Sequence, residues 1–545
     1  MSILQKIKDF KLKLTSRTTT ILLSFYFGYF LNMALIRFLF ERIKIDSVGS
    51  FLFLLSLLLF IFVIYFIIFS VVLITKYSKI LIAIFLLISA QINYLMFKLG
   101  VYIDADMVRN LFETNRQEVF DLITFSNFLW LLITGIIPTI IFTKYIKIEF
   151  KPLANEVIDR IYSIAGTLVI VFLFGLANYK SYVSFIRSNR EGRKLVNTLN
   201  YIYSLSKYLK SEYTDDQPFA IIDDSVKYVG KNQHKTLLIF VLGETARSAN
   251  FSLGGYEKNK TNPLLSKQNI VYYDAVKSCG TATATSLPCM FSYLNRTNFN
   301  IKKAKNSENI LDLLSKAGYN VSWIGNYGTG CKSICDRIKH ETVKKDSTLC
   351  KGEYCRDEIL LNSLNDKIQN LQDNSVIVLH TIGSHGPTYY ERYSDRFKTF
   401  KPTCDTADIR KCSRESIVNT YDNTILYTDW FLSSIIDIVK KINDISVALI
   451  YVSDHGESLG ESNLYLHGLP YVIAPKYQTE VPMVVYMNEL MKQEHNISYD
   501  CLKGSSKKKN FSHDNIFHSL LGLLEVESKI YNENLDIFKK CIVKK

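Results

Sequence analysis

Long apolar segments, separated by short polar ones, fill the first third of the chain. Five of them, each of about 18 to 25 residues, carry almost no charge and cover residues 21–40, 51–75, 80–97, 125–143 and 161–178. A helix of about 20 residues crosses the apolar layer of a bilayer. A cleaved signal peptide does not explain the first segment, because four more follow it. The pattern therefore predicts an α-helical membrane domain of five transmembrane helices over residues 1–180.

A different pattern covers residues 181–210, "SYVSFIRSNREGRKLVNTLNYIYSLSKYLK", where aromatic, apolar and basic residues are interspersed. Such a mixture is typical of amphipathic helices that lie on a membrane surface. A solvated linker helix fits it equally well. Together with the polar connector that follows, it defines a juxtamembrane and linker segment over residues 181–234.

From residue 235 onward, short β-branched apolar runs alternate with helical patterns. The runs are "TLLIFVLGE" (236–244), "NVSWIGN" (320–326), "SVIVLHTIGSHG" (375–386) and "VALIYVSDHGE" (447–457). Runs of this kind are typical of strands buried on both faces of a parallel sheet. Residues 235–545 are therefore predicted to form a soluble α/β domain whose mainly parallel sheet is flanked by helices.

Basic residues beside the apolar segments predict the orientation in the membrane. They are Lys6, Lys8, Lys11, Lys13, Arg17, Lys76, Lys79, Lys144, Lys147 and Lys151. Such flanks lie on the cytoplasmic side, so five crossings place the chain after about residue 180 on the opposite side. The net charge of +14 suits anionic lipids or phosphorylated glycolipids. No nucleic-acid-binding motif accompanies it, so nucleic acid is not an expected partner.

The ten cysteines all lie in the soluble part of the chain. Most are close in sequence, in the pairs Cys279/Cys289, Cys331/Cys335, Cys350/Cys355 and Cys404/Cys412, which leaves Cys501 and Cys541 to pair by elimination. An even number of clustered cysteines on the external side indicates disulfides in an oxidising compartment. A cysteine zinc site is the alternative, but the chain has no CxxC pair.

Polar residues that could bind a metal follow three of the predicted strands. Glu244 follows the first, His385 lies just past another, and Asp454 and His455 follow a third. Sites in parallel sheets form at the carboxyl ends of the strands, and these residue types are good zinc ligands.

The segment "SCGTATATSLPCMFS" (278–292) places threonines just before a predicted helix start, where a phosphate is favoured. A threonine hydroxyl needs a metal or a base to become a nucleophile, and zinc lowers the pKa of a bound oxygen acid. The combination suggests a metal-activated threonine that attacks phosphorus.

These motifs carry a family resemblance. "GETAR" (243–247), "SCGTATATSLPCMFS", "SHGP" (384–387), "SDHGESLGE" (453–461) and "YLHGLP" (465–470), in this order after five apolar segments, resemble the phosphoethanolamine transferases. These are inner-membrane enzymes of Gram-negative bacteria, with a periplasmic domain of the alkaline phosphatase/sulfatase fold, and they include lipid A transferases and mobile colistin-resistance enzymes. The resemblance covers essentially the whole chain, most firmly residues 236–470.

The resemblance implies the roles of individual residues. It implies one tightly bound zinc ion held by Glu244, Thr283, Asp454 and His455, with Thr283 as the nucleophile. Lys332, His385 and His467 would lie on the phosphate side, where they could also hold a second zinc ion. Asn110, Thr114 and Glu118, spaced to share one helical face, would hold the ethanolamine headgroup. The alternatives are a surface lysine, structural histidines and the polar face of a connecting helix. Histidines that match no motif are expected to be structural, among them His340, His380, His495, His513 and His518.

The implied reaction transfers phosphoethanolamine from phosphatidylethanolamine, through a covalent phosphoethanolamine-threonine, to a lipid A phosphate. A lipopolysaccharide core sugar or another periplasmic glycan stays open as acceptor. A glycerol-phosphate transferase and a non-catalytic membrane scaffold also stay open. Sulfatase activity is set aside, because it needs a C/S-x-P-x-R motif that "LPCMF" does not supply.

Overall fold

The computed structural model of the protein describes residues 10–113, 122–177, 179–213, 218–326, 328–351, 354–508 and 510–543. The chain forms two compact units. We call Met1–Ala105 with Ile123–Lys207 the helical unit, and Asp106–Leu122 with Tyr208–Lys545 the α/β unit.

The helical unit contains five helical segments that are long and apolar enough to cross a membrane, which confirms the five predicted segments. They are Ser16–Arg42, Val48–Val72, Ser78–Leu99, Phe125–Tyr145 and Leu153–Leu176. Their main helices are α2 (Ser16–Gly28), α3 (Met33–Arg42), α4 (Val48–Val72), α5 (Ser78–Tyr94), α8 (Phe125–Leu131), α9 (Ile137–Ile140) and α10 (Leu153–Ala177).

The fifth helix begins eight residues earlier than its apolar pattern suggests. The reason is a buried ion pair in its first turns, in which Arg160 Nη2 lies 2.8 Å from Glu156 Oε1. The guanidinium of Arg160 also donates to the carbonyl oxygens of Ser70 and Leu73 at the end of α4. Pairing and hydrogen bonding offset the cost of burying both charges, so the helix tolerates them.

The first segment is interrupted where a continuous helix was expected. A short 3-10 turn, Phe30–Asn32, separates α2 from α3. The Asn32 amide donates to the Phe27 carbonyl at 2.7 Å and to the Tyr65 hydroxyl at 2.8 Å. Two more helices, α11 (Tyr179–Ser188) and α12 (Asn197–Tyr213), occupy the segment expected to be amphipathic. Their place at a membrane surface stays a prediction.

The α/β unit is built on a seven-stranded sheet in the order β5-β14-β11-β4-β10-β6-β7. It is mainly parallel, as the apolar runs predict. The strands are β4 (Lys235–Gly243), β5 (Val271–Lys277), β6 (Asn320–Gly325), β7 (Lys339–Thr342), β10 (Ser375–His380), β11 (Ile445–Ser453) and β14 (Glu480–Met487). β14 runs antiparallel to both of its neighbours, β11 and β5, and the other neighbouring pairs are parallel.

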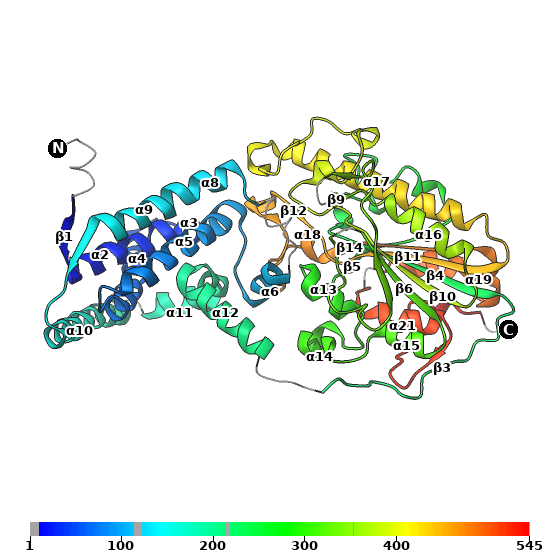
Figure 1. The fold of residues 1–545 in the computed structure, drawn as a ribbon, viewed down its shortest axis with the longest axis horizontal. Coiled ribbons are helices and arrows are strands. Elements are labelled where there is room, and N and C mark those ends of the chain that lie inside the picture. The colour runs from blue at the N-terminus through cyan, green and yellow to red at the C-terminus, as the bar shows by residue number, and fades with distance from the viewer. Residues whose placement is uncertain are drawn as a thin grey trace. The chain divides into compact units, whose positions relative to one another are not determined.

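Both faces of the sheet are covered by helices (Figure 1), which is why the central strands β4 and β11 are buried at every position after their first residue. In β4, Leu238 and Phe240 pack with α13 (Thr283–Met290), α15 (Ile310–Lys316) and α21 (Asp514–Leu523). Leu237 and Ile239 point the other way and pack with α16 (Ile359–Gln369) and α17 (Arg414–Val439). Alternate residues of each strand therefore belong to two separate cores.

The ten cysteines form five disulfides, Cys279–Cys289, Cys331–Cys335, Cys350–Cys355, Cys404–Cys412 and Cys501–Cys541. All of them lie in the α/β unit, and they are the pairs expected from the sequence. The cysteines therefore cross-link segments within this unit, as the disulfide interpretation predicts.

Candidate active site

The register of two neighbouring strands creates the site. β4 and β11 are parallel, with Gly243 opposite Ser453 at their carboxyl ends. The next residues, Glu244 and Asp454, therefore leave the sheet side by side, and His455 follows at once. The loop after β10 joins them, because the Ser384 N–H donates to the Glu244 carbonyl at 2.9 Å.

Glu244, Asp454 and His455 form a buried triad. His455 Nε2 lies 3.4 Å from Glu244 Oε1 and 3.4 Å from Asp454 Oδ2. One ligand atom of each residue lies within 4.8 Å of the others, which is the spacing of a metal-ion site. His455 Nδ1 bonds the Gly456 carbonyl at 2.9 Å, so Nε2 faces the two carboxylates.

Thr283 completes this group. It is the first residue of α13, and its Oγ1 lies 3.1 Å from Glu244 Oε2 and 3.3 Å from His455 Nε2. The turn before the helix is tight: a Cβ on Gly280 would lie 2.9 Å from the backbone nitrogen of Ser286. The structure therefore brings together all four residues that the sequence assigns to one zinc ion.

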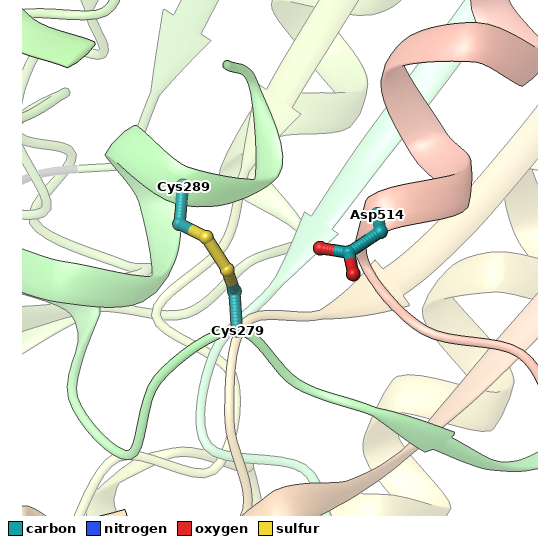
Figure 2. Close-up of side chains that lie close together, drawn as sticks. All are labelled: Cys279, Cys289 and Asp514. Carbon is teal, nitrogen blue, oxygen red and sulfur yellow. A yellow bond between two sulfur atoms is a disulfide. The ribbon is translucent and has the colours of Figure 1, made fainter. Parts of the chain in front are cut away.

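A disulfide and a serine hold this loop. Figure 2 shows the Cys279–Cys289 bridge, which joins the residue at the start of the loop to α13, with Asp514 of α21 beside it. The Ser286 hydroxyl, one turn into α13, donates to the Asp454 carbonyl. The loop that carries Thr283 is therefore fixed to its own helix and to the end of β11.

The charges of the triad favour a bound cation. Burial and the nearby Glu244 charge raise the pKa of Asp454 to about 7. Burial alone would lower the pKa of His455, but the two carboxylates raise it to about 10. Burial would raise the pKa of Glu244, yet His455 holds it well below its usual value. Within the described chain, Asp454 Oδ2 has no hydrogen-bond partner. Two buried carboxylates, one imidazole and a hydroxyl fit a zinc ion. Its positive charge would offset the repulsion between the Glu244 and Asp454 carboxylates.

Both histidines that are predicted for the phosphate side, His385 and His467, lie beside the triad. The ring of His467 is 4.4 Å from that of His455 and 5.4 Å from that of His385, measured between centroids. Glu457, which the sequence analysis did not single out although it lies in "SDHGESLGE", is buried with its Oε1 3.4 Å from His467 Nδ1. These three side chains extend the polar site on one side of the triad.

Lys332 contacts a different element. Its ammonium donates to the backbone carbonyl of Glu113 at 2.8 Å, and Lys305 Nζ lies 2.7 Å from the Glu113 carboxylate. Glu113 ends α6 (Ala105–Glu113), the helix that also carries Asn110. Thr114 and Glu118 lie outside the described residues. α6 therefore packs in the α/β unit, although the sequence encodes it between the third and fourth apolar segments.

Asp357 supports the backbone of the loop that leads to His385, and no sequence motif marks it. It is buried and accepts the backbone N–H groups of Ile382 at 2.7 Å and Gly383 at 3.0 Å, in the loop that leads to His385. Burial raises its pKa to about 6, although these donors oppose the shift. Gly383 has φ +50°, and a Cβ there would lie 2.5 Å from the Glu244 carbonyl, so this loop needs a glycine.

Comparison with known proteins identifies the family. The model described as phosphoethanolamine transferase EptA/EptB matches residues 61–213, and the sulfatase model matches residues 236–526. The chain is 38% identical over 530 residues to phosphoethanolamine transferase EptA of Escherichia coli K12, covering 96% of each. The chain belongs to the phosphoethanolamine transferase family. The resemblance seen in its motifs is confirmed, and the protein is a transferase with a sulfatase-like α/β unit.

Two further relatives cover most of this transferase. Phosphatidylethanolamine transferase Mcr-1 of Escherichia coli is 33% identical over 73% of the chain and 76% of its own length. The solved structure of the integral membrane protein lipooligosaccharide phosphoethanolamine transferase A from Neisseria meningitidis is 34% identical, with a TM-score of 0.94 over 98% of this chain and all of that one. The helical unit and the α/β unit therefore both have counterparts in an integral membrane protein.

Asp357 gives a test of how the site is supported. We expect Asp357→Asn to lower the free energy of unfolding at pH 8 by about 1–3 kcal/mol, because an amide N–H₂ would face the Gly383 N–H without an acceptor. Denaturant unfolding of the full chain, followed by the fluorescence of Trp323 and Trp430, measures the change. Asp366→Asn, at an exposed position on α16, is the matched control and should leave unfolding unchanged. Equal stability of the two variants would contradict this role of Asp357.

Proposed function

We propose that this transferase moves phosphoethanolamine from phosphatidylethanolamine to a lipopolysaccharide acceptor, with lipid A as the leading candidate, through Thr283. The position of the Thr283 hydroxyl, 3.1 to 3.3 Å from two members of a buried metal-binding triad, carries the proposal. The names of Mcr-1, a phosphatidylethanolamine transferase, and of the Neisseria relative, which acts on lipooligosaccharide, support the donor and the acceptor.

Glu244, Asp454, His455 and Thr283 would hold one zinc ion. A zinc ion bound there would lower the pKa of the threonine hydroxyl, which is otherwise a poor nucleophile at neutral pH. His385 and His467, together with Glu457, offer ligands for a second ion on the phosphate side. Zinc is the cofactor that suits this mixture of carboxylate, imidazole and hydroxyl ligands.

In the first half of the reaction, Thr283 Oγ attacks the phosphorus of phosphatidylethanolamine. A bond forms between Oγ and phosphorus, and the bond from phosphorus to the diacylglycerol oxygen breaks. The hydroxyl proton leaves and the diacylglycerol oxygen gains one. Thr283 lies at the N-terminus of α13, where the helix dipole favours the negative charge of the phosphoryl group.

In the second half, an acceptor oxygen attacks the phosphoethanolamine-threonine and restores the hydroxyl. Covalent catalysis in this way uses one site for two displacements. We assign the imidazoles of His385 and His467 to hydrogen bonds with the transferred phosphoryl group. Lys332 would join them once its ammonium leaves the Glu113 carbonyl, and Asn110, Thr114 and Glu118 would hold the ethanolamine end of the donor.

This reaction fits a protein of the bacterial inner membrane with a cytoplasmic N-terminus. The basic flanks of the apolar segments and the five disulfides of the α/β unit both support a periplasmic position for that unit. There it would meet the lipid donor and the glycolipid acceptor in the same compartment.

The nucleophile can be identified directly. With labelled phosphatidylethanolamine and zinc, we expect the purified protein to carry a phosphoethanolamine adduct on Thr283. Thr283→Ala should lose the adduct and lower turnover by about 10³-fold or more, since removal of a nucleophile costs at least this much. Peptide mass spectrometry locates the adduct. Thr285→Ala, two residues along the same helix, is the control and should keep it. A wild-type protein without any adduct would disprove the covalent mechanism.

The metal ligands predict a loss of zinc. The wild-type protein should retain about one zinc ion per chain after dialysis, because three ligands of the triad would hold it and Thr283 would occupy the fourth position. Glu244→Ala and Asp454→Ala should each reduce zinc affinity by more than the ~10- to 100-fold that loss of a group hydrogen-bonded to a ligand side chain causes. Elemental analysis of the dialysed proteins measures this, with the exposed Glu415→Ala as control. Unchanged zinc in either ligand variant would remove that residue from the site.

The acceptor is tested in cells. Lipid A from a strain that expresses the wild-type protein should gain the mass of phosphoethanolamine, and lipid A from a Thr283→Ala strain should not. Mass spectrometry of lipid A and of the separated core oligosaccharide distinguishes the two acceptors. A mass increase confined to the core would replace lipid A by a core sugar, with the rest of the proposal intact.

A further inference from the structure

His513 is a buried histidine that no motif explains. It lies immediately before α21 and is only 1% exposed to solvent. Its backbone N–H donates to the Lys277 carbonyl at 2.9 Å, which brings this segment alongside the end of β5. Its hydrogen bonds place the ring between the end of β11 and the loop of residues 279–283, here called the nucleophile loop.

Both ring nitrogens of His513 bind backbone groups of the site. Nδ1 accepts the N–H of Cys279 at 3.1 Å, and Nε2 lies 3.0 Å from the Ser453 carbonyl oxygen. Because a backbone N–H donates to Nδ1, the ring proton must be on Nε2, from which it is donated to Ser453. Burial lowers the pKa of His513 to about 3, so the ring stays neutral and keeps this arrangement.

The two groups that the ring joins belong to the two halves of the site. Cys279 starts the loop that carries Thr283, and Ser453 directly precedes Asp454 and His455. Figure 2 shows Cys279 tied to α13 by its disulfide, with Asp514, the residue after His513, next to it. One imidazole therefore lies between the nucleophile loop and the strand end that holds two ligands.

The sheet itself does not make this connection. The nucleophile loop follows β5, the ligands follow β11, and β14 lies between these two strands. No backbone ladder therefore links β5 to β11 directly. Two other described contacts cross this gap: the Ser286 hydroxyl donates to the Asp454 carbonyl, and Thr283 Oγ1 lies 3.3 Å from His455 Nε2. Ser286 Oγ is itself 3.4 Å from His513 Nδ1. The His513 ring therefore contacts the nucleophile loop, Ser286 and the end of β11.

We propose that His513 is a positioning residue for the transfer reaction, which sets the distance between Thr283 Oγ and the Glu244–Asp454–His455 triad through Cys279 and Ser453. The proposal rests on the proposed function of Thr283 as nucleophile. The His513 side chain would touch neither the donor nor the phosphoryl group. Its effect should therefore fall on the chemical step and leave binding of the donor and of zinc unchanged.

Two variants separate positioning from core filling. His513→Phe keeps the ring's shape but removes both hydrogen bonds. His513→Asn loses packing volume but places an amide oxygen where Nδ1 stands, so it can still accept the Cys279 N–H. We expect the Phe variant to form the Thr283 adduct about 10- to 100-fold more slowly, because small displacements of a reacting group cost rate steeply. The Asn variant should recover part of that loss although it packs less well.

The experiment uses the full-length protein in detergent, loaded with zinc and supplied with labelled phosphatidylethanolamine. It measures kcat and KM for adduct formation, zinc per chain and the oxidation state of the cysteines. We expect a lower kcat in His513→Phe, with KM, zinc content and disulfides as in the wild type. His518→Phe is the matched control: His518 lies on α21, the helix that His513 precedes, is also buried, and its Nδ1 likewise accepts a backbone N–H, from Asn532 at 3.2 Å. It should leave kcat unchanged.

Several results would overturn the proposal. A wild-type kcat in His513→Phe would do so, and so would a parallel loss of zinc and activity in the Phe and Asn variants, which indicates a purely structural role. If His518→Phe slows the reaction as much, the effect is not specific to the loop. A wild-type enzyme that forms no Thr283 adduct defeats the proposed function and the positioning role together. An adduct in the wild type with an unaffected Phe variant defeats the positioning role alone.

Discussion

The structure depends on the burial of two like charges at neighbouring strand ends. The parallel register of β4 and β11 makes Glu244 and Asp454 adjacent, and both side chains are buried. Buried carboxylates are costly unless they are paired or bind a metal. The imidazole of His455 and the hydroxyl of Thr283 complete a group that is suited to a divalent cation. A site with this charge balance trades stability of the fold for affinity toward that cation.

Much of the fold could be predicted, because apolar runs report burial directly. The spans and the strands of the parallel sheet follow from this pattern. The first half of α17 does not, because its inward face carries Asp422 and Asn423, which look exposed in a sequence. Asp422 is in fact fully buried, with the Tyr256 hydroxyl 2.7 Å from its carboxylate. A pattern of polar and apolar letters cannot distinguish a solvated polar residue from one whose partner is about 170 positions away.

The residues of the site also divide into those that the sequence predicts and those that it does not. The triad and Thr283 could be assigned because they follow strands and lie in recognisable motifs. Asp357 and His513 could not, because each acts on backbone atoms of residues far along the chain and has no fixed spacing to them. When a side chain binds a backbone N–H or carbonyl, the partner can be almost any residue type. The identity of the partner therefore does not reveal the contact. Supporting residues of this kind become visible only when the tertiary structure is known.

The helix α6 has a consequence for how the enzyme is studied. Its Glu113 binds both Lys305 and Lys332, yet the chain reaches it between two apolar helices rather than within the α/β region. An α/β domain produced alone from about residue 218 would lack this helix, and its two lysines would meet solvent instead. In such a fragment the triad would be complete, but Lys305 and Lys332 would lack the contacts with Glu113 that hold them in the full-length enzyme. Rates and affinities measured on the fragment would therefore describe a different arrangement of Lys332.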